Sequence, residues 1–468
     1  MSSRFLIVFS ILFFVSCKTD EGVSIPPIDD DDRGPTGSEI PFFVMSSGFN
    51  KIVDEPKVAG NMAVYIEQEL ILQQPIGIEF RGSTSQRLFP KKSYGVETWD
   101  EKGEDISISI LDFPVEEDWV FNGPYSDKTF LRNVLIFDIS NDIGRYASRT
   151  QFVEVKVNRD YLGIYVLMEK LKRDKERIAI EKLEAGQTDS GIITGGYILK
   201  IDKTSGDTNN PDWPGDFAYS ERLGFRSDYN PQGEVISYPP YADKSGEETY
   251  FLYEYPKADE INFNQKSYIQ NYIKDFEVAL INEDFSDPNR AYMKYIDLPS
   301  FVDFFILNEL SANPDAYRLS TYMHKDRGEK LKMGPIWDFN LAFGNDARSA
   351  EQQWIYKFND RNPADLWLVH FWWLKLLEDP IFKVSVKDRW NQIQSQINPT
   401  LINGKIDAWV EYLEVNGAVD RNFERWETEG VPLVFNSFVG ASFEEDVEYL
   451  KAWYQRRVDW MDSQIQSW

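Results

Sequence analysis

Two aspartates in aromatic-rich turns are the residues of this chain best suited to chemistry. Asp338 lies between Trp337 and Phe339, and Asp315 lies 23 residues upstream in a second turn that follows an apolar run. Carboxylates bind divalent cations, and they also orient or deprotonate hydroxyl groups. The pair therefore predicts a site in which one carboxylate holds a metal ion and the other acts on a hydroxyl.

The elements expected around the two aspartates place them close together. The Asn313-Pro314 pair breaks the helix expected before Asp315, because the proline disfavours helical geometry in the residue before it. Residues 319–334 read as two short strands joined by a polar turn, and Asp338 comes just after the second strand. Because a hairpin brings its two ends together, we expect Asp315 and Asp338 to be neighbours.

The composition is that of a globular protein and excludes several kinds of partner. The 468 residues are 42% hydrophobic and 15% aromatic, enough for two to three domains or for one large bilobed domain. A net charge of −27 argues against nucleic acid as a partner, so an anionic substrate needs local basic side chains or a bound cation. The two histidines, His324 and His370, are too few for a His-rich zinc or iron site.

The N-terminal 39 residues predict export and membrane attachment. Residues 5–15 form an apolar run with the length of a signal-peptide core, too short to span a bilayer. Cys17, the single cysteine, follows directly and resembles the acylated cysteine of bacterial lipoproteins, although a spare cysteine in an ordinary signal peptide is the alternative. We expect residues 1–16 to be a signal peptide and residues 17–39 a lipidated, flexible tether.

The residues after Cys17 suggest where the protein is located. The sequence Lys18-Thr19-Asp20-Glu21 resembles the acidic export signal of surface lipoproteins in the Bacteroidetes. The expected location is therefore the cell envelope, in the outer membrane, with exposure at the cell surface as one option. Contact with the membrane is expected through the N-terminal lipid only.

Residue patterns divide the rest of the chain into a strand-rich part and a helical part. We expect an α+β fold with a sheet-rich N-terminal lobe at about 40–203, a polar loop insertion at about 204–248 and a helical C-terminal lobe at about 249–468. The expected strands are 62–72, 75–81, 106–110, 152–157, 161–168 and 195–201, and the expected helices are 128–142, 268–281, 298–310, 367–377, 401–416 and 443–466.

Several segments, taken together and in order, resemble the spore coat protein H (CotH) family of atypical secreted kinases. The matching segments are FRGSTS at 80–85, PKKSY at 90–94, DWV at 118–120, SDKT at 126–129, LRN at 131–133, GIYVLMEK at 163–170, GGYI at 195–198, DAYR at 315–318, WDFNLAFG at 337–344 and WW at 372–373. The resemblance implies a divergent protein-kinase-like bilobed fold over residues 40–468. It also implies transfer of the γ-phosphoryl group of ATP to Ser or Thr hydroxyls of an acceptor protein, with Mg²⁺ or Mn²⁺.

The resemblance also assigns roles to individual residues. Asp315 matches the catalytic acid of the family, and Asp338 matches the metal-binding acid, with Asn340 as an expected further ligand. A strand lysine paired with a glutamate is the kinase arrangement for phosphate binding, and which lysine fills that role stays open. The residues expected to contact the nucleotide are Arg81, Ser83, Ser85, Lys91, Lys92, Glu169 and Lys170.

The chain departs from ordinary kinases at two places. It has no G-x-G-x-x-G loop, so the hydroxyl and amide groups of residues 83–85 would have to cover the phosphates. Ser320 stands five residues after Asp315, where ordinary kinases carry a metal-binding asparagine. Asn313, Asn340 and Asn345 are alternative sources of that ligand.

Other interpretations stay open from the sequence. A catalytically silent pseudokinase or surface lipoprotein would use some of the 14 Trp and 24 Tyr residues to recognise a glycan or an envelope protein. A glycoside hydrolase also needs two carboxylates, and nucleotidyl transfer is an alternative to phosphoryl transfer. In a purely structural interpretation, Asp338 caps a turn, Arg132 and Arg318 form ion pairs, and Lys91 and Lys92 are a solvated pair.

Overall fold

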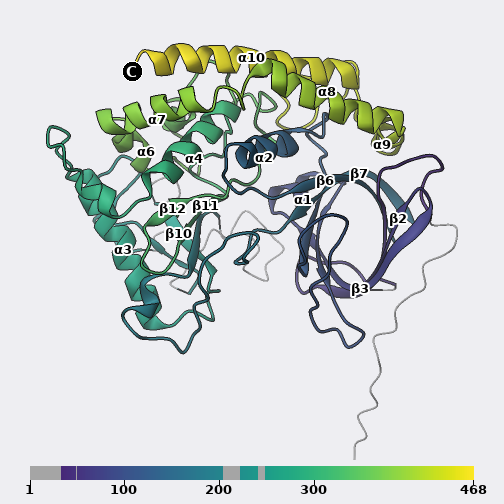
Figure 1. Cartoon of the computed structure of the whole chain (residues 1–468), viewed down its shortest axis with the longest axis horizontal. Coiled ribbons are helices and arrows are strands. Elements are labelled where there is room, and N and C mark those ends of the chain that lie inside the picture. The colour runs from purple at the N-terminus through teal and green to yellow at the C-terminus, as the bar shows by residue number, and fades with distance from the viewer. Residues whose placement is uncertain (1–32, 49, 204–221, 241–247) are drawn as a thin grey trace, which may run out of the picture.

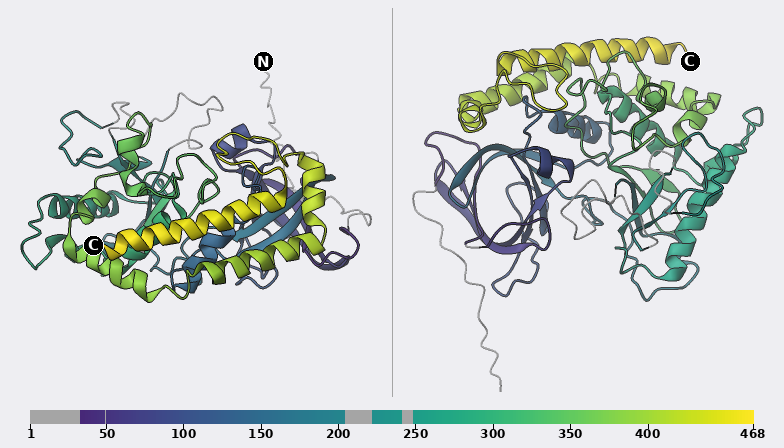
Figure 2. Two further views of the ribbon diagram at one scale, coloured as in Figure 1. Left: turned by 90° about the horizontal axis from the view of Figure 1, so that it is seen from above. Right: turned by 180° about the vertical axis from the view of Figure 1, so that it is seen from behind.

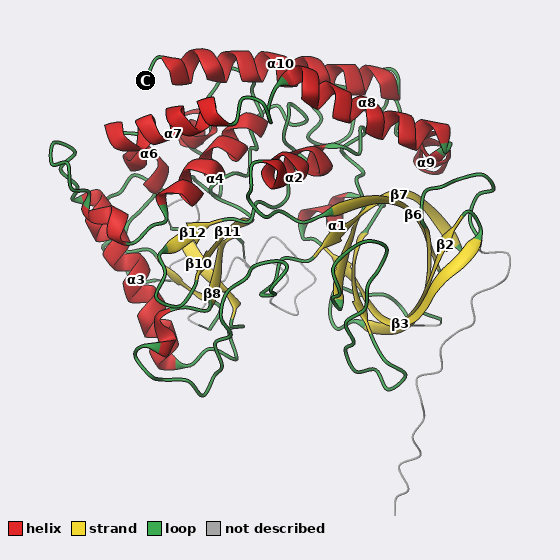
Figure 3. Cartoon of the chain, in the orientation of Figure 1, coloured by secondary structure: helices red, strands yellow, loops and turns green. Residues whose placement is uncertain are grey.

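The computed structural model describes residues 33–48, 50–203, 222–240 and 248–468, which form the expected α+β fold. A strand barrel and a separate five-stranded sheet stand side by side, and a layer of helices lies across both (Figures 1 and 3). The predicted signal peptide, Cys17 and most of the predicted tether lie outside the described residues. No helix in the described part of the chain is long and apolar enough to span a membrane.

The strand-rich N-terminal part is a closed seven-stranded barrel with the order β1–β2–β3–β4–β5–β7–β6. Alternate residues such as Phe43, Ile78, Trp119 and Tyr165 fill its interior. The parallel pairing of β1 with β6 closes the barrel and leaves no free edge. The strands are β1 (Phe42–Ser46), β2 (Val58–Ile66), β3 (Glu69–Arg81), β4 (Ser93–Thr98), β5 (Asp118–Asn122), β6 (Thr150–Val157) and β7 (Asp160–Glu169).

Two expected strands of this region were wrong. The apolar run at 62–72 contains a hairpin turn, in which Glu67 and Gln68 both adopt positive φ, so it is divided between β2 and β3. Residues 106–110 contribute an isolated bridge at Ile108 and no strand. The hairpin expected over 152–168 is confirmed as β6 and β7.

The second sheet has the order β12–β11–β8–β10–β9. The strand expected at 195–201 forms β8, which pairs with β10 and β11 of this sheet and not with the barrel. The expected insertion at 204–248 includes strand β9, while residues 204–221 and 241–247 lie outside the described part. The strands are β8 (Tyr197–Ile201), β9 (Gly224–Arg226), β10 (Tyr250–Tyr255), β11 (Thr321–Lys325) and β12 (Leu331–Met333).

The helices tie the barrel to the second sheet. Helix α4 lies inside the largest apolar core, α10 packs on α4, α7 and α8, and α9 packs on barrel strand β7. Seen from above, α10 runs across the other helices (Figure 2). The main helices are α2 (Arg132–Asp142), α3 (Phe263–Ile281), α4 (Leu298–Ser311), α7 (Pro380–Gln392), α8 (Pro399–Val415), α9 (Ala418–Trp426) and α10 (Phe443–Gln466); short helices are α1 (Thr84–Leu88), α5 (Phe358–Arg361) and α6 (Trp372–Leu376).

Candidate active site

The turn after α4 and the β11–β12 hairpin bring the two predicted aspartates together. Helix α4 ends at Ala312, which adopts a left-handed conformation with φ +45°. The Asn313 side chain then spans both turns: its Oδ1 accepts from Asp315 N at 3.1 Å, and its Nδ2 lies 3.5 Å from Asp338 O. Because one side chain joins the two turns, the expectation that Asp315 and Asp338 are neighbours is confirmed.

Both the backbone conformation of Asp338 and the ionised form of its side chain are unfavourable. Its φ of +66° is strained for a residue with a side chain. The residue Asp338 is exposed to solvent on one side, yet many protein atoms lie around its carboxylate. Desolvation, together with the charges of Asp315 and Asp202, raises its pKa to about 6. A carboxylate with such neighbours is well suited to bind a cation, because the cation offsets the repulsion between the negative charges of Asp338, Asp315 and Asp202.

A third acid, Asp202, completes the group. Asp202 follows β8, which lies beside β11, and Ser320 Oγ donates to Asp202 Oδ2 at 3.5 Å. Burial, and more weakly the charge of Asp315, raises the pKa of Asp202. Asp202 is not among the residues expected from the sequence; its one local signal is an acid directly after a buried strand, and that signal does not show which acids lie nearby.

Arg318 fixes the position of Asp315. Its guanidinium donates to Asp315 Oδ1 at 2.8 Å, to Asp365 Oδ1 at 3.0 Å and to Trp367 O at 3.0 Å. The side chain of Arg318 is buried, with its guanidinium 4.1 Å from the centroid of the Phe358 ring. Arg318 is therefore a structural partner that orients the carboxylate of Asp315.

The N-terminal end of α2 holds the turn that carries Asp338. Asn133 Oδ1 accepts from Phe339 N at 2.7 Å, and Arg132 Nε donates to Ala342 O at 3.1 Å. Arg132 also pairs with Asp127, so the ion-pair interpretation of Arg132 is confirmed. Asn345 is buried, and its Nδ2 donates to Ser126 O and to Asn340 O. Asn340 itself lies half-buried two residues after Asp338.

The end of strand β3 brings the barrel to the acids. Arg81 lies with its guanidinium 5.6 Å from the Trp337 ring, and its charge lowers the pKa of Asp338 against the effect of burial. Gly82, at φ +94°, then turns the chain into α1, and a side chain at Gly82 would collide with Ser85 Oγ. Arg81 and the start of the Ser83–Ser85 segment therefore lie between the barrel and the second sheet.

The structure does not bring Lys91 and Lys92 to the acids. Lys91 is 1% exposed, and its ammonium donates to Ile164 O at 2.6 Å and to Asn422 Oδ1 at 2.8 Å. Burial alone lowers the pKa of Lys91. Lys92 donates to Phe89 O at 2.7 Å. Lys91 is therefore a buried structural lysine and Lys92 bonds to the local backbone, so the alternative of a solvated pair does not describe Lys91.

Glu169 and Lys170 also differ from the expected arrangement, because they do not pair with each other. Glu169 is buried and pairs with Arg149 at 2.7 Å, whereas Lys170 pairs with Asp118 at 2.9 Å. Successive residues at the end of a strand point to opposite faces, which gives the two side chains different partners. Glu169 and Lys170 therefore do not form the lysine–glutamate pair that is typical of kinases.

Replacing Lys91 by methionine is expected to lower stability without changing nucleotide affinity. The variant removes the lysine donor of Ile164 O and one of the two donors of Asn422 Oδ1, which also accepts from Ile164 N, at a cost of about 1–3 kcal/mol in the free energy of unfolding. Urea unfolding and an ATP titration, compared between the variant and the wild type, measure the two quantities. A loss of ATP affinity in a folded Lys91→Met variant would return Lys91 to the nucleotide site.

Oxygen ligands at the candidate site fit a hard divalent cation. Three carboxylates, with Asn340 nearby, are the donor set that Mg²⁺ or Mn²⁺ prefers. Among the described residues, the trio with carboxylate oxygens all within 4.8 Å of one another is a different one, Glu116, Glu117 and Asp118. Lys172 Nζ already neutralises that trio, at 3.0 Å from Glu116 and 2.9 Å from Asp118. The Asp338 group is therefore the better candidate for a metal.

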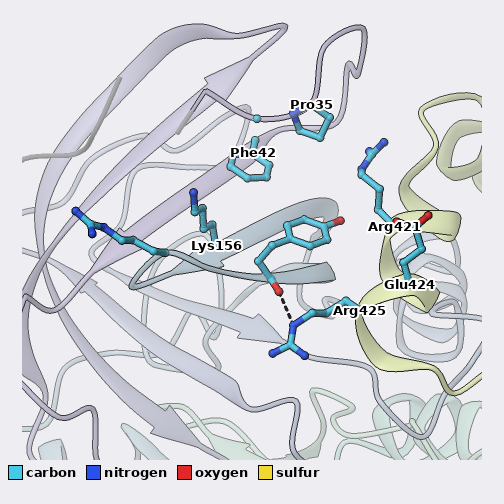
Figure 4. A pocket seen from close by; sticks show the side chains of 9 residues that line it. Pro35, Phe42, Lys156, Arg421, Glu424 and Arg425 are labelled. Carbon is cyan, nitrogen blue, oxygen red and sulfur yellow. Dashed lines mark hydrogen bonds between the residues drawn. The ribbon is translucent and has the colours of Figure 1, made fainter. Parts of the chain in front are cut away.

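A cavity lies away from the acids, between the barrel and α9 (Figure 4). It has a volume of about 510 Å³, and its lining includes Lys156, Arg159, Arg421 and Arg425. Its arginines on α9 already have partners: Arg421 binds buried Glu154 through two bonds, and Arg425 donates to Tyr161 O at 2.8 Å. These pairs join α9 to the barrel, which gives the cavity a structural explanation.

Magnesium is expected to stabilise the chain more at pH 7.5 than at pH 5. The pKa of Asp338 is about 6 in the folded chain, above its ordinary 3.8, so the native state is favoured by protonation at low pH and loses that advantage as pH rises through 6. Bound Mg²⁺ offsets the loss only where Asp338 is ionised. Thermal unfolding with Mg²⁺ and with EDTA at the two pH values measures the difference; equal Mg²⁺ shifts at both would contradict it.

The sequence matches the model of a known protein family. The family model described as CotH kinase protein matches residues 78–461, which include Arg81, Asp202, Asp315 and Asp338. The chain therefore belongs to the CotH kinase family. No curated protein matches the sequence.

Proposed function

We propose that this protein is a kinase that transfers the γ-phosphoryl group of ATP to Ser or Thr hydroxyls of an acceptor protein. The observation that carries the proposal is that Asp315 and Asp338 lie close together at the two ends of the β11–β12 hairpin, where Asn313 joins their turns. The chain that carries them belongs to the CotH kinase family. A divalent metal, Mg²⁺ or Mn²⁺, is the proposed cofactor.

In this proposal the fold is a divergent version of the two-lobed kinase arrangement. The barrel takes the place of the N-terminal lobe, and the second sheet with its helices takes the place of the C-terminal lobe (Figure 1). Arg81 and the Ser83–Ser85 segment approach the acids from the barrel, and Asp202, Asp315 and Asp338 approach from the second sheet. The nucleotide would bind between them.

Asp315 and Asp338 have separate tasks in this proposal. Asp315, oriented by Arg318, accepts the proton of the acceptor hydroxyl as the new O–P bond forms and the bond from phosphorus to the leaving ADP oxygen breaks. Asp338 and Asn340 would hold the metal, which when bound neutralises phosphate charge. Arg81 and the hydroxyls of Ser83 and Ser85 would contact the phosphates from the barrel side.

The proposed place of action is the cell envelope. The sequence before the described residues supports a lipid anchor at Cys17, an outer-membrane location and an envelope protein as acceptor. Conversion of Cys17 to alanine is the direct test of the anchor, because it should release the protein from the membrane fraction.

Incubation with ATP labelled at either the γ- or the α-phosphate tests the function. The purified chain, Mg²⁺ or Mn²⁺ and candidate envelope proteins are combined, and protein-bound label is measured. The proposal predicts transfer of the γ-label and not of the α-label. Transfer of the α-label would indicate a nucleotidyltransferase, and absence of both label and nucleotide binding would favour the binding-lipoprotein alternative.

A further inference from the structure

We propose that Lys203 binds the phosphates of the nucleotide, an assignment that rests on the proposed phosphoryl transfer. Lys203 comes directly after Asp202, beyond the end of strand β8, and is not among the cations expected from the sequence. The structure places it where the barrel, the second sheet and the acids meet.

The contacts of Lys203 join both halves of the site. Its Nζ donates to Thr84 Oγ1 at 2.8 Å, and Thr84 is the central residue of the Ser83–Ser85 segment. Its ammonium also lies 5.5 Å from the centroid of the Trp367 ring, and the backbone of Trp367 accepts from Arg318. Lys203 therefore bridges the segment expected to cover the phosphates and the residues that orient Asp315.

The charges around Asp338 support the same assignment. Lys203 and Arg81 are two cations close enough for their charges to act on Asp338. An anionic phosphate chain next to Asp202, Asp315 and Asp338 needs such cations, because a charge of −27 on the whole chain offers no general attraction. An ammonium has three donors, so it can hold Thr84 and phosphate oxygens at the same time.

The lysines expected from the sequence do not compete for this role. Lys91 donates to Ile164 O of strand β7, Lys92 donates to Phe89 O directly after α1, and Lys170 pairs with Asp118. Lys200, on the same strand as the site, pairs with Glu254 at 3.3 Å. Of these lysines, Lys203 is thus the one whose charge acts on Asp338, together with that of Arg81.

Nucleotide titrations on the full chain test the assignment. MgATP and adenosine are titrated by calorimetry into the wild type, Lys203→Met, Lys203→Gln and the control Lys182→Met. Lys182 is an exposed lysine, so the control removes the same charge at a distance. We expect the Lys203 variants to weaken MgATP binding about 10- to 100-fold, the loss of a charged hydrogen bond, and to leave any binding of adenosine unchanged.

A Lys203→Arg variant distinguishes phosphate binding from a purely structural role. It keeps a cation at the site, and we expect it to retain more MgATP affinity than Lys203→Gln. Equal losses in Lys203→Arg and Lys203→Gln, or no loss in Lys203→Met and Lys203→Gln, would overturn the assignment. A wild type that does not bind MgATP would instead refute the proposed function itself, together with the role of Lys203.

Discussion

Replacing Asp338 by asparagine is expected to reduce metal-dependent phosphoryl transfer by a factor on the order of 10³. The amide keeps the size of the side chain but loses the charge that would hold the metal. Activity assays with γ-labelled ATP and saturating Mg²⁺ measure the loss. Glu117→Gln is the matched control, because it removes one carboxylate from the trio that Lys172 neutralises, and its activity should remain within about threefold of wild type.

The same substitution is expected to leave the fold intact and slightly more stable. Asp338 is ionised at a cost in the folded chain above pH 6, and asparagine removes that cost. Because the carboxylate is reachable by solvent, the gain is small, about 1–2 °C in Tm in EDTA at pH 7.5 and near zero at pH 4. An inactive variant with a much lower Tm would mean that Asp338 serves the fold and not the reaction.

Replacing Asp315 by asparagine is expected to lower kcat about 10²- to 10⁴-fold with little change in ATP affinity. Asparagine keeps an oxygen acceptor for Arg318 but cannot take the proton of the acceptor hydroxyl. Rapid-quench kinetics and ATP titrations separate the two effects.

Asp365→Asn is the matched control for Asp315, because both carboxylates accept from the guanidinium of Arg318. Asp365 has no role in the proposed reaction, so its variant should keep kcat within about threefold of wild type. If both variants lost the same activity, Arg318 positioning would explain the loss and Asp315 would have no direct role as a base.

The local part of the site was predictable from the sequence. The Asn313-Pro314 break after α4 and the polar turn between β11 and β12 are short-range signals, and together they place Asp315 beside Asp338. The N-terminus of α7 carried a similar signal that was not used: Asp379 caps Ile381 N, and Pro380 occupies the first turn. Helix α7 is therefore absent from the helices expected after residues 367–377.

The long-range part was not predictable in this way. Closure of the barrel depends on β1 pairing with β6, more than 100 residues apart, and the location of β8 depends on its pairing with β11. The bonding partners of individual side chains also depend on contacts between distant parts of the sequence: Lys91 binds Asn422 on α9, 331 residues away. The side chains of Asp202 and Lys203 therefore reach the site through tertiary pairing alone.

Intact-mass and peptide mass spectrometry of acceptor proteins, after incubation with ATP and Mg²⁺, tests the central claim most directly. The wild type should add phosphate to Ser or Thr hydroxyls of an envelope protein or of the chain itself, and folded Asp338→Asn and Asp315→Asn should not. Equal phosphate addition by wild type and Asp338→Asn, or none by a wild type that also fails to bind MgATP, would contradict a phosphoryl-transfer site built on these two aspartates.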